Sequence, residues 1–145
     1  MPDKSPAMQG GSRRVGGSDG SSQSGDCTLA RTYAAIDLGT NNCRLLIAEP
    51  RDTGFHVVDA FSRIVRLGEG VDSSGVLSDA AIDRTVSALR VRAGKMRSSR
   101  VARTRTVATE ACRRAANGQG FLDRVARETG IDLEIIDPGE EAGLA

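Results

Sequence analysis

Three short runs of mostly apolar residues occupy the first part of the chain that can fold. Residues 32–37 and 43–49 are two such runs, and residues 55–67 are rich in β-branched and aromatic side chains after the turn at Thr53-Gly54. Runs of this kind, bounded by turn-forming residues, predict buried strands. Because only short turns separate them, we expect three consecutive strands that form an antiparallel meander.

A helix is the clearest element of the pattern. Residues 67–77 are dense in Gly and Ser and predict a loop, after which Ser78 is a favourable N-cap. Apolar residues then recur at intervals of four, three, four and three positions, namely at Ile82, Val86, Leu89, Ala93 and Met96. This periodicity predicts an amphipathic helix.

The remaining pattern alternates between strands and helices. The predicted elements are a strand over 101–109, a short helix over 110–116 closed by Asn117 and Gly118, a helix from about Phe121 to its closing Gly130, a strand over 133–136, a turn over 137–139 and the first turn of a helix over 140–145. Strands and helices in this order predict an α/β fold.

Composition separates residues 1–30 from the rest of the chain. This segment holds six Gly, six Ser and seven apolar residues, which are too few to offset the entropy of ordering it. We therefore expect a disordered leader over 1–30 and a folded region over 31–145. No apolar run is long enough for a secretory signal or a membrane span, so we expect a cytoplasmic protein with no membrane partner.

Charge and cysteine content exclude several classes of protein. The formal net charge is +1, so the chain as a whole has no strong affinity for polyanions. Cys27, Cys43 and Cys112 are widely spaced, which supports neither a disulfide framework nor a zinc site. We expect Cys43 and Cys112 to be small buried residues, and we assign the lone His56 no catalytic role.

The most chemically suggestive segment is residues 37–42, Asp-Leu-Gly-Thr-Asn-Asn, directly after a predicted strand. A carboxylate at the end of a strand can hold a metal ion. A Gly that lets backbone amides point inward, followed by hydroxyl and amide side chains, can bind a phosphate. The same residue types are frequent in hairpin turns, and spacing alone favours that alternative.

Four segments in this order resemble one protein family. YAAIDLGTNNCRLLIAE resembles the first phosphate loop of the actin-like ATPase superfamily. SRIVRLGEGV (62–71), VATEACRRAANG (107–118) and IIDPGEEAGLA (135–145) narrow the resemblance to the exopolyphosphatase and guanosine pentaphosphate phosphohydrolase (Ppx/GppA) family. The resemblance covers residues 32–145. It implies an actin-like, ribonuclease H-like subdomain, with a mixed sheet that contains the three-stranded meander and has flanking helices.

The resemblance also implies roles for individual residues. Asp37 would help to hold Mg²⁺, the terminal phosphate would be bound by Gly39, Thr40, Asn41 and Arg113, and Glu141 would be the general base that orients and deprotonates water. The implied reaction is Mg²⁺-dependent hydrolysis of a phosphoanhydride in polyphosphate or guanosine pentaphosphate. By chemistry alone, a solvated arginine and an acid at a helix N-terminus are the alternative interpretations of Arg113 and Glu141.

A basic segment, residues 84–114, is independent of this resemblance. It holds ten Lys or Arg residues and the single acid Glu110. A row of guanidinium groups suits polyphosphate or RNA because each neutralised phosphate releases counterions, so a non-catalytic polyanion-binding module is the alternative function. An ordinary solvated basic face explains the segment equally well. Nucleic acid is less favoured, because aromatic residues do not interleave with the basic ones.

The chain is shorter than the family that it resembles. Family members have several hundred residues and carry a second Gly-rich loop, of the form DIGGGS, in a second domain, whereas this sequence reaches Ala145 before any such loop. We therefore expect an N-terminal phosphatase subdomain, truncated before the second loop, with little or no turnover by itself. An apolar face left by the absent domain would favour a homo-oligomer.

Overall fold

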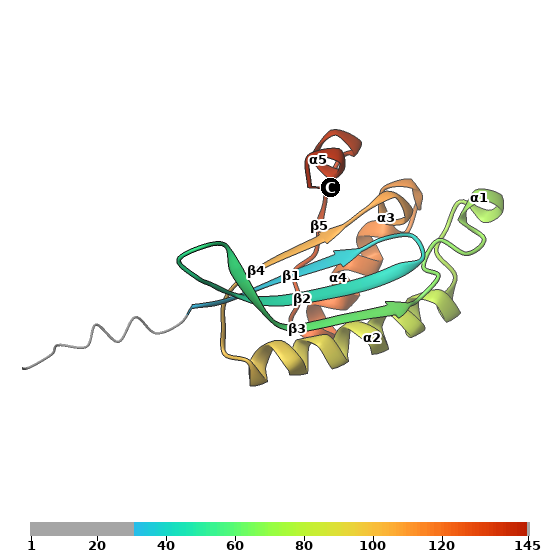
Figure 1. Ribbon diagram of the computed structural model, residues 1–145. Coiled ribbons are helices and arrows are strands. Elements are labelled where there is room, and N and C mark those ends of the chain that lie inside the picture. Colours follow the sequence, from blue (N-terminus) through green and yellow to red (C-terminus); the bar gives the residue numbers. More distant parts are fainter. Residues whose placement is uncertain (1–30, 145) are drawn as a thin grey trace, which may run out of the picture.

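The structure is a computed structural model that describes residues 31–144, with the backbone alone for Glu141, Ala142 and Leu144. The leader predicted over 1–30 lies outside the described residues. The elements are, in chain order, β1 Thr32–Leu38, β2 Asn42–Pro50, β3 Phe55–Ile64, α1 Val71–Ser74, α2 Asp79–Ser98, β4 Val101–Ala108, α3 Glu110–Arg114, α4 Gly118–Thr129, β5 Glu134–Ile135 and α5 Pro138–Leu144 (Figure 1).

The described strands form one mixed sheet with the order β3-β2-β1-β4-β5. β1 pairs antiparallel with β2, and β2 with β3, whereas β4 runs parallel to both β1 and β5. The predicted meander and the mixed α/β sheet are confirmed. Strand β4 follows helix α2 because a parallel strand requires a crossover connection. As a result, the carboxyl ends of β1, β4 and β5 lie at the same edge of the sheet.

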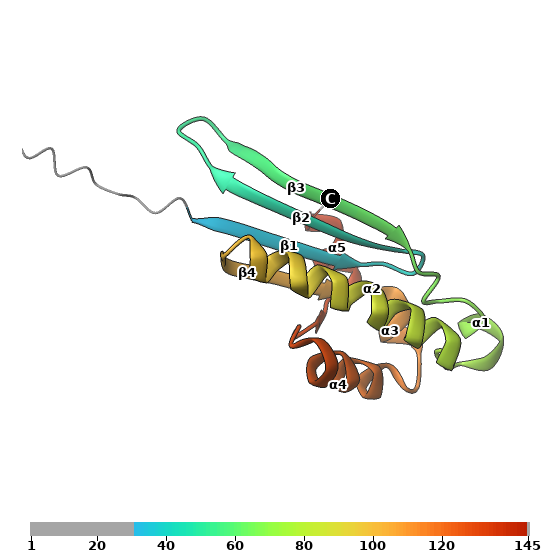
Figure 2. The same ribbon diagram turned by 90° about the horizontal axis from the view of Figure 1, so that it is seen from below.

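The two faces of the sheet differ in what covers them. Along β1, buried residues such as Ile36 and Leu38 alternate with the exposed Tyr33, Ala35 and Asp37. The buried residues pack into a core with α2 and α4, which lie on one side of the sheet, while α5 lies on the other side (Figures 1 and 2). We call the face that carries Asp37 the open face. The sequence predicted a buried strand, and within the described residues β1 is buried on one face.

Helix α2 begins where the sequence predicts. The Ser78 hydroxyl accepts a hydrogen bond from the Ala81 amide at 3.2 Å, as expected of an N-cap. The predicted apolar stripe is buried in the core, apart from Met96, which is partly buried against it. Arg92 is also fully buried, which the apolar periodicity did not predict.

The prediction that residues 67–77 form only a loop is wrong, because they contain the one-turn helix α1. Gly70 and Gly75 flank it in the left-handed conformation, with φ of 80° and 73°. These angles suit glycine, which has no Cβ to clash with the backbone. The helix is too short to show a periodic pattern in the sequence.

The prediction that Asn117 and Gly118 close α3 is also wrong, since these residues begin α4. The Asn117 side chain accepts a hydrogen bond from the Leu77 amide at 2.8 Å and donates one to the Leu77 carbonyl at 3.0 Å. It therefore fastens the start of α4 to the segment before α2. Helix α3 instead ends at Arg114, because Ala115 adopts an extended conformation.

The last elements are of the predicted types, but their boundaries differ: α4 begins at Gly118 instead of about Phe121, and the strand predicted over 133–136 is only Glu134–Ile135. Gly130 closes α4 in the left-handed conformation, as predicted. Helix α5 begins at Pro138, earlier than predicted, because the Asp137 carboxylate accepts a hydrogen bond from the Glu140 amide at 2.9 Å and proline fits the first turn of a helix. Within residues 31–144, no helix combines the length and the apolar character that a membrane span requires.

Candidate phosphate-binding site

The segment between β1 and β2 is a tight turn at the sheet edge where β1 ends. Asp37 is the next-to-last residue of β1, is exposed on the open face, and lies opposite Arg44 of β2. The Gly39 amide donates a hydrogen bond to the Asn42 carbonyl at 2.9 Å, which closes the turn over residues 39–41. The hairpin-turn interpretation is thus confirmed. The phosphate-binding interpretation of the same residues stays a prediction.

A second segment, residues 65–68, donates hydrogen bonds to the backbone of this turn. The Val65 and Arg66 amides both donate to the Asn41 carbonyl, at 2.8 and 3.0 Å, and the Gly68 amide donates to the Thr40 carbonyl at 3.0 Å. A Cβ atom on Gly68 would lie 2.3 Å from Thr40 Cγ2, so any larger residue would displace the Thr40 side chain or this segment. Three hydrogen bonds therefore fix the backbone of the turn.

Helix α3 begins beside the same turn. The amide and the hydroxyl of Thr109 both donate to the Leu38 carbonyl, at 3.1 and 3.2 Å. Arg113, one turn further along, is partly buried, and its Nη1 donates to the Ile136 carbonyl at 2.6 Å. These contacts place Asp37, the turn at 39–41 and the helix that carries Arg113 at one edge of the sheet.

Helix α5 follows β5 at this edge and carries Glu141. The Ile136 amide donates to the Ala108 carbonyl at 3.2 Å, which ties the approach to α5 to the end of β4. The Glu141 side chain lies outside the described part of the structure. Its role as general base stays a prediction.

Asp37 offers one carboxylate to a metal ion at this edge. It borders a hollow of about 390 Å³ on the open face, whose lining is mainly apolar and includes Leu46, Ala60 and Phe61. Within the part of the chain that the structure describes, no three His, Cys, Asp or Glu side chains gather into a metal-binding group. One carboxylate suits Mg²⁺, which keeps several water ligands and takes others from substrate phosphates. The donor set therefore fits a magnesium ion that binds together with its substrate.

The two described cysteines are buried. Burial raises the pKa of Cys43 to about 11 and that of Cys112 to about 12. Both thiols are therefore protonated at neutral pH, and a protonated thiol is a poor nucleophile. The prediction that they are small buried residues is confirmed.

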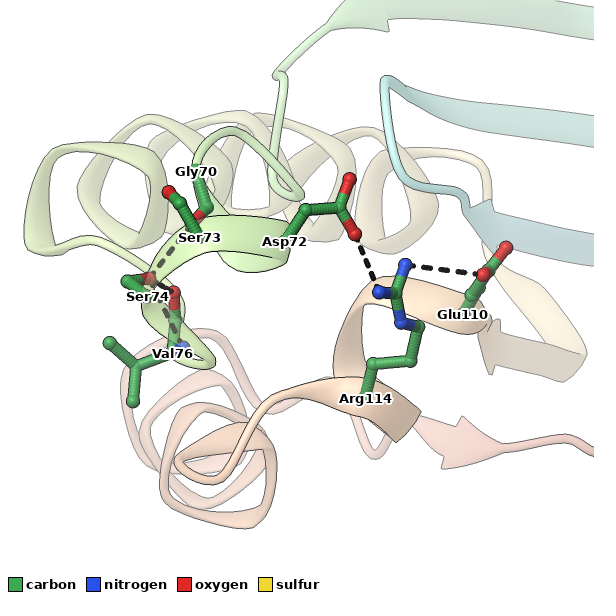
Figure 3. A network of polar contacts seen from close by, with 7 residues as sticks. All are labelled: Gly70, Asp72, Ser73, Ser74, Val76, Glu110 and Arg114. Atoms are coloured by element: carbon green, nitrogen blue, oxygen red, sulfur yellow. Dashed lines mark hydrogen bonds and ion pairs between the residues drawn. The ribbon is translucent and has the colours of Figure 1, made fainter.

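The adjacent arginines of α3 have different partners. Arg114 is exposed, and its guanidinium contacts Asp72 of α1 at 2.5 Å and Glu110 at 3.5 Å (Figure 3). The hydrogen bond that Arg114 donates to the Asp72 carboxylate raises the pKa of Arg114 above its ordinary value. Arg114 thus joins α1 to α3 at the surface, whereas Arg113 points toward the segment before α5 through its bond to Ile136.

The basic segment does not form one continuous cationic face. Arg92 donates to the carbonyls of Ala88 and Cys43 at 2.7 and 3.2 Å, and its guanidinium carbon lies 4.5 Å from the centre of the Phe61 ring. The expectation that Arg92 adds to a polyanion-binding row is therefore wrong. Because burial removes water from the charged group, the pKa of Arg92 is lowered.

Exposed arginines of the segment gather near the outer edge of β4. Arg97 and Arg100 line a hollow of about 330 Å³, and Arg105 lines a neighbouring hollow of about 650 Å³. Asp132 and Glu134 also line the larger hollow, so acids partly balance its positive charge.

Two residues that build the candidate site were missed in the sequence. Thr109 and Gly68 both lie inside segments that carry the family resemblance, and that was their only signal. Their partners, Leu38 and Thr40, are 71 and 28 positions away in the chain. Local patterns carry no information on contacts across such separations.

Solved structures define the class of fold. The Ppx/GppA family member of Aquifex aeolicus superposes with a TM-score of 0.74 at 37% identity, over 77% of this chain and 36% of that chain. An exopolyphosphatase from Cytophaga hutchinsonii superposes with a TM-score of 0.75 at 31% identity, over 79% and 36%. The protein therefore has the actin-like ATPase-type fold that the resemblance implied.

Sequence comparison then defines the family. The model of the Ppx/GppA phosphatase family matches residues 46–145. Exopolyphosphatase 2 of Mycobacterium tuberculosis is 41% identical over 124 residues, which cover 77% of this chain and 38% of that protein. The chain belongs to the Ppx/GppA phosphatase family, and it spans less than two fifths of the length of these relatives.

Proposed function

We propose that residues 31–145 form an N-terminal phosphatase subdomain, one side of the active site of an exopolyphosphatase-type hydrolase. The substrate is inorganic polyphosphate or guanosine pentaphosphate, and the terminal phosphate is released. The turn at 39–41 carries this proposal, because it is fixed by hydrogen bonds and lies beside the Asp37 carboxylate. Membership of a phosphatase family supports hydrolysis as the reaction class.

Each side chain has one task in this proposal. Gly39 allows the substrate to approach the backbone, Thr40 and Asn41 donate hydrogen bonds to the terminal phosphate, and Arg113 neutralises part of its charge. Asp37 would hold Mg²⁺, which when bound would offset negative charge on the transferred group. Glu141 orients the attacking water and accepts its proton.

The reaction needs little covalent chemistry from the protein. The oxygen of water attacks the terminal phosphorus, and the bond to the bridging oxygen breaks with its electron pair on the leaving phosphate chain. The donors of the turn and Arg113 stabilise the charge that spreads over the transferred group. The products are inorganic phosphate and a substrate that is one phosphate shorter.

Substitution tests the proposal against a polyanion-binding module. The chain is assayed by itself and fused to the remaining length of the Mycobacterium tuberculosis relative, with polyphosphate or guanosine pentaphosphate, in Mg²⁺ and in EDTA. We expect Asp37→Asn and Glu141→Gln to lower phosphate release by the fusion at least 100-fold. They should change the affinity for long polyphosphate less than threefold, because many dispersed cations contribute to that affinity. Joint replacement of Arg90, Arg97 and Arg105 by Gln should lower the affinity for polyphosphate and leave phosphate release nearly unchanged.

Either of two results would contradict the proposed function. One is phosphate release by the fusion that persists in EDTA and in Asp37→Asn. The other is a loss of turnover only when the three arginines are replaced. The second result would favour the binding module, of which Arg97 and Arg105 line the hollows beside β4.

A further inference from the structure

Helix α2 contacts the segment that holds the candidate phosphate-binding turn. Arg84 donates from Nε to the Val65 carbonyl at 2.9 Å and from Nη2 to the Arg66 carbonyl at 3.4 Å. The same Nη2 contacts the Glu69 carboxylate at 2.9 Å. One guanidinium thus contacts Val65, Arg66 and Glu69, all in the segment between β3 and α1.

A single peptide group links Arg84 to the turn. The peptide between Val65 and Arg66 accepts the Arg84 hydrogen bond at its carbonyl and donates to the Asn41 carbonyl through its N–H, at 2.9 and 3.0 Å. A cationic donor at one end of a peptide group polarises it and strengthens the hydrogen bond at the other end. The position and the strength of the contact to Asn41 therefore both depend on Arg84.

The conformation of Arg66 gives this dependence a physical reason. Its φ is 50°, in the left-handed region that residues with a Cβ adopt only at a cost. Such a conformation persists when surrounding contacts hold it. Three hydrogen bonds hold Arg66: its N–H donates to the Asn41 carbonyl at 3.0 Å, and its carbonyl accepts from the Glu69 amide at 3.1 Å and from Arg84 Nη2 at 3.4 Å.

We propose that Arg84 is a positioning residue for the phosphate-binding turn. It fixes the backbone of residues 65–68, and through them the donors at 39–41, without contacting the bound anion. This inference rests on the proposed function of the turn. The sequence analysis counted Arg84 among the basic residues that could bind a polyanion. In this proposal Arg84 instead holds the backbone of the phosphate-binding turn in place.

The test uses the 145-residue chain with tripolyphosphate and Mg²⁺ as the probe. Affinity is measured by calorimetry, and exchange of the Arg66 and Gly68 amide hydrogens is followed by NMR. Arg84→Gln should weaken binding at least tenfold and speed both exchanges at least tenfold. Arg84→Lys should have an affinity and exchange rates between those of the unmodified chain and Arg84→Gln, because one ammonium cannot reproduce the forked geometry of a guanidinium.

The control is Arg127→Gln, which removes the same charge from an exposed position on α4. We expect it to change affinity less than twofold and to leave both exchanges unchanged. Equal losses of affinity in Arg84→Gln and Arg127→Gln would overturn the inference in favour of a general charge effect. Unchanged affinity in a folded Arg84→Gln chain would overturn it as well, with the proposed function intact. No binding of the probe by the unmodified chain would overturn the proposed function itself, and the inference with it.

Discussion

The turn after β1 and the basic segment are both suited to phosphate, and the structure organises them in opposite ways. At the turn, the carbonyls of Thr40 and Asn41 are bound by three amides, so a few backbone groups are held in one arrangement. In the basic segment there are many cations, but Arg92 lies in the core, Lys95 pairs with Asp59 and Arg114 pairs with Asp72.

This difference separates two kinds of anion binding. Fixed donors stabilise one geometry of charge and are suited to a transition state. Dispersed surface cations bind by releasing counterions, with an affinity that falls steeply as salt is added. The number of charges in a segment therefore says less about a catalytic site than the contacts that fix its backbone.

Substitution of Arg92, which is buried in the core, should have the largest effect on stability. Arg92→Ala should lower the free energy of unfolding by about 3 kcal/mol because it leaves a cavity beside Phe61. Arg92→Met should cost about 1 kcal/mol or less, since an apolar side chain avoids burying a charge whose Nε has no hydrogen-bond partner within the described residues. Urea unfolding measures both, and a negligible cost for Arg92→Ala would place this arginine at the surface.

Gly68→Ala should disturb the backbone of the turn at 39–41 without changing the charge of the site. Gly68→Ala places a methyl group 2.3 Å from Thr40 Cγ2, so we expect a loss of about 2 kcal/mol in stability and a tenfold loss of tripolyphosphate affinity. The matched control is Gly120→Ala, because no atom lies within 4 Å of the added methyl group. That change in α4 should be neutral or stabilise the chain by up to about 1 kcal/mol. Equal affinity in both variants would show that the turn does not bind the probe.

The buried thiols predict a loss of stability at high pH. Cys43 and Cys112 have pKa values raised to about 11 and about 12 by burial, above their ordinary value of 9.0. Between these values the unfolded chain loses thiol protons that the folded chain keeps, so stability falls as pH rises above about 9. Each thiol should account for about 1 kcal/mol at pH 10. Replacement of both by Ala should flatten this part of the curve in urea unfolding, and an unchanged slope would contradict the burial.

The smallest effect should come from the exposed arginines beside β4. Arg97→Gln and Arg105→Gln should each lower the slope of log affinity for long polyphosphate against log salt concentration by about 1 or less. Affinity for tripolyphosphate at the turn should stay within twofold. A tenfold loss for tripolyphosphate in either variant would move the primary phosphate site from the turn to the basic segment.

Much of the fold could be predicted because its signals are local. The N-cap Ser78, the apolar stripe of α2 and the closing Gly130 depend on neighbouring residues, and all three are confirmed. The roles of Asn117 and Arg92 depend on contacts 40 and 49 positions away along the chain. No periodicity reports such contacts, so these predictions were wrong.

For the candidate site, the sequence indicated which residue types lie in the turn, and not which residues hold the turn in place. The segment at 37–42 stood out because a carboxylate, a glycine and polar side chains follow a strand. Its support by Gly68, Thr109 and Arg84 was not visible, because each of these residues acts through a backbone group that is distant in sequence. Residue types identify the chemistry of a loop, and the fold determines which residues hold it in place.

The most direct test of the central claim is an amide NMR titration of the isotope-labelled chain with tripolyphosphate in Mg²⁺. The account predicts that the largest shifts occur at Gly39, Thr40 and Asn41, that they saturate, and that they diminish in EDTA. Shifts confined to residues 97–105, without saturation and abolished by moderate salt, would contradict it.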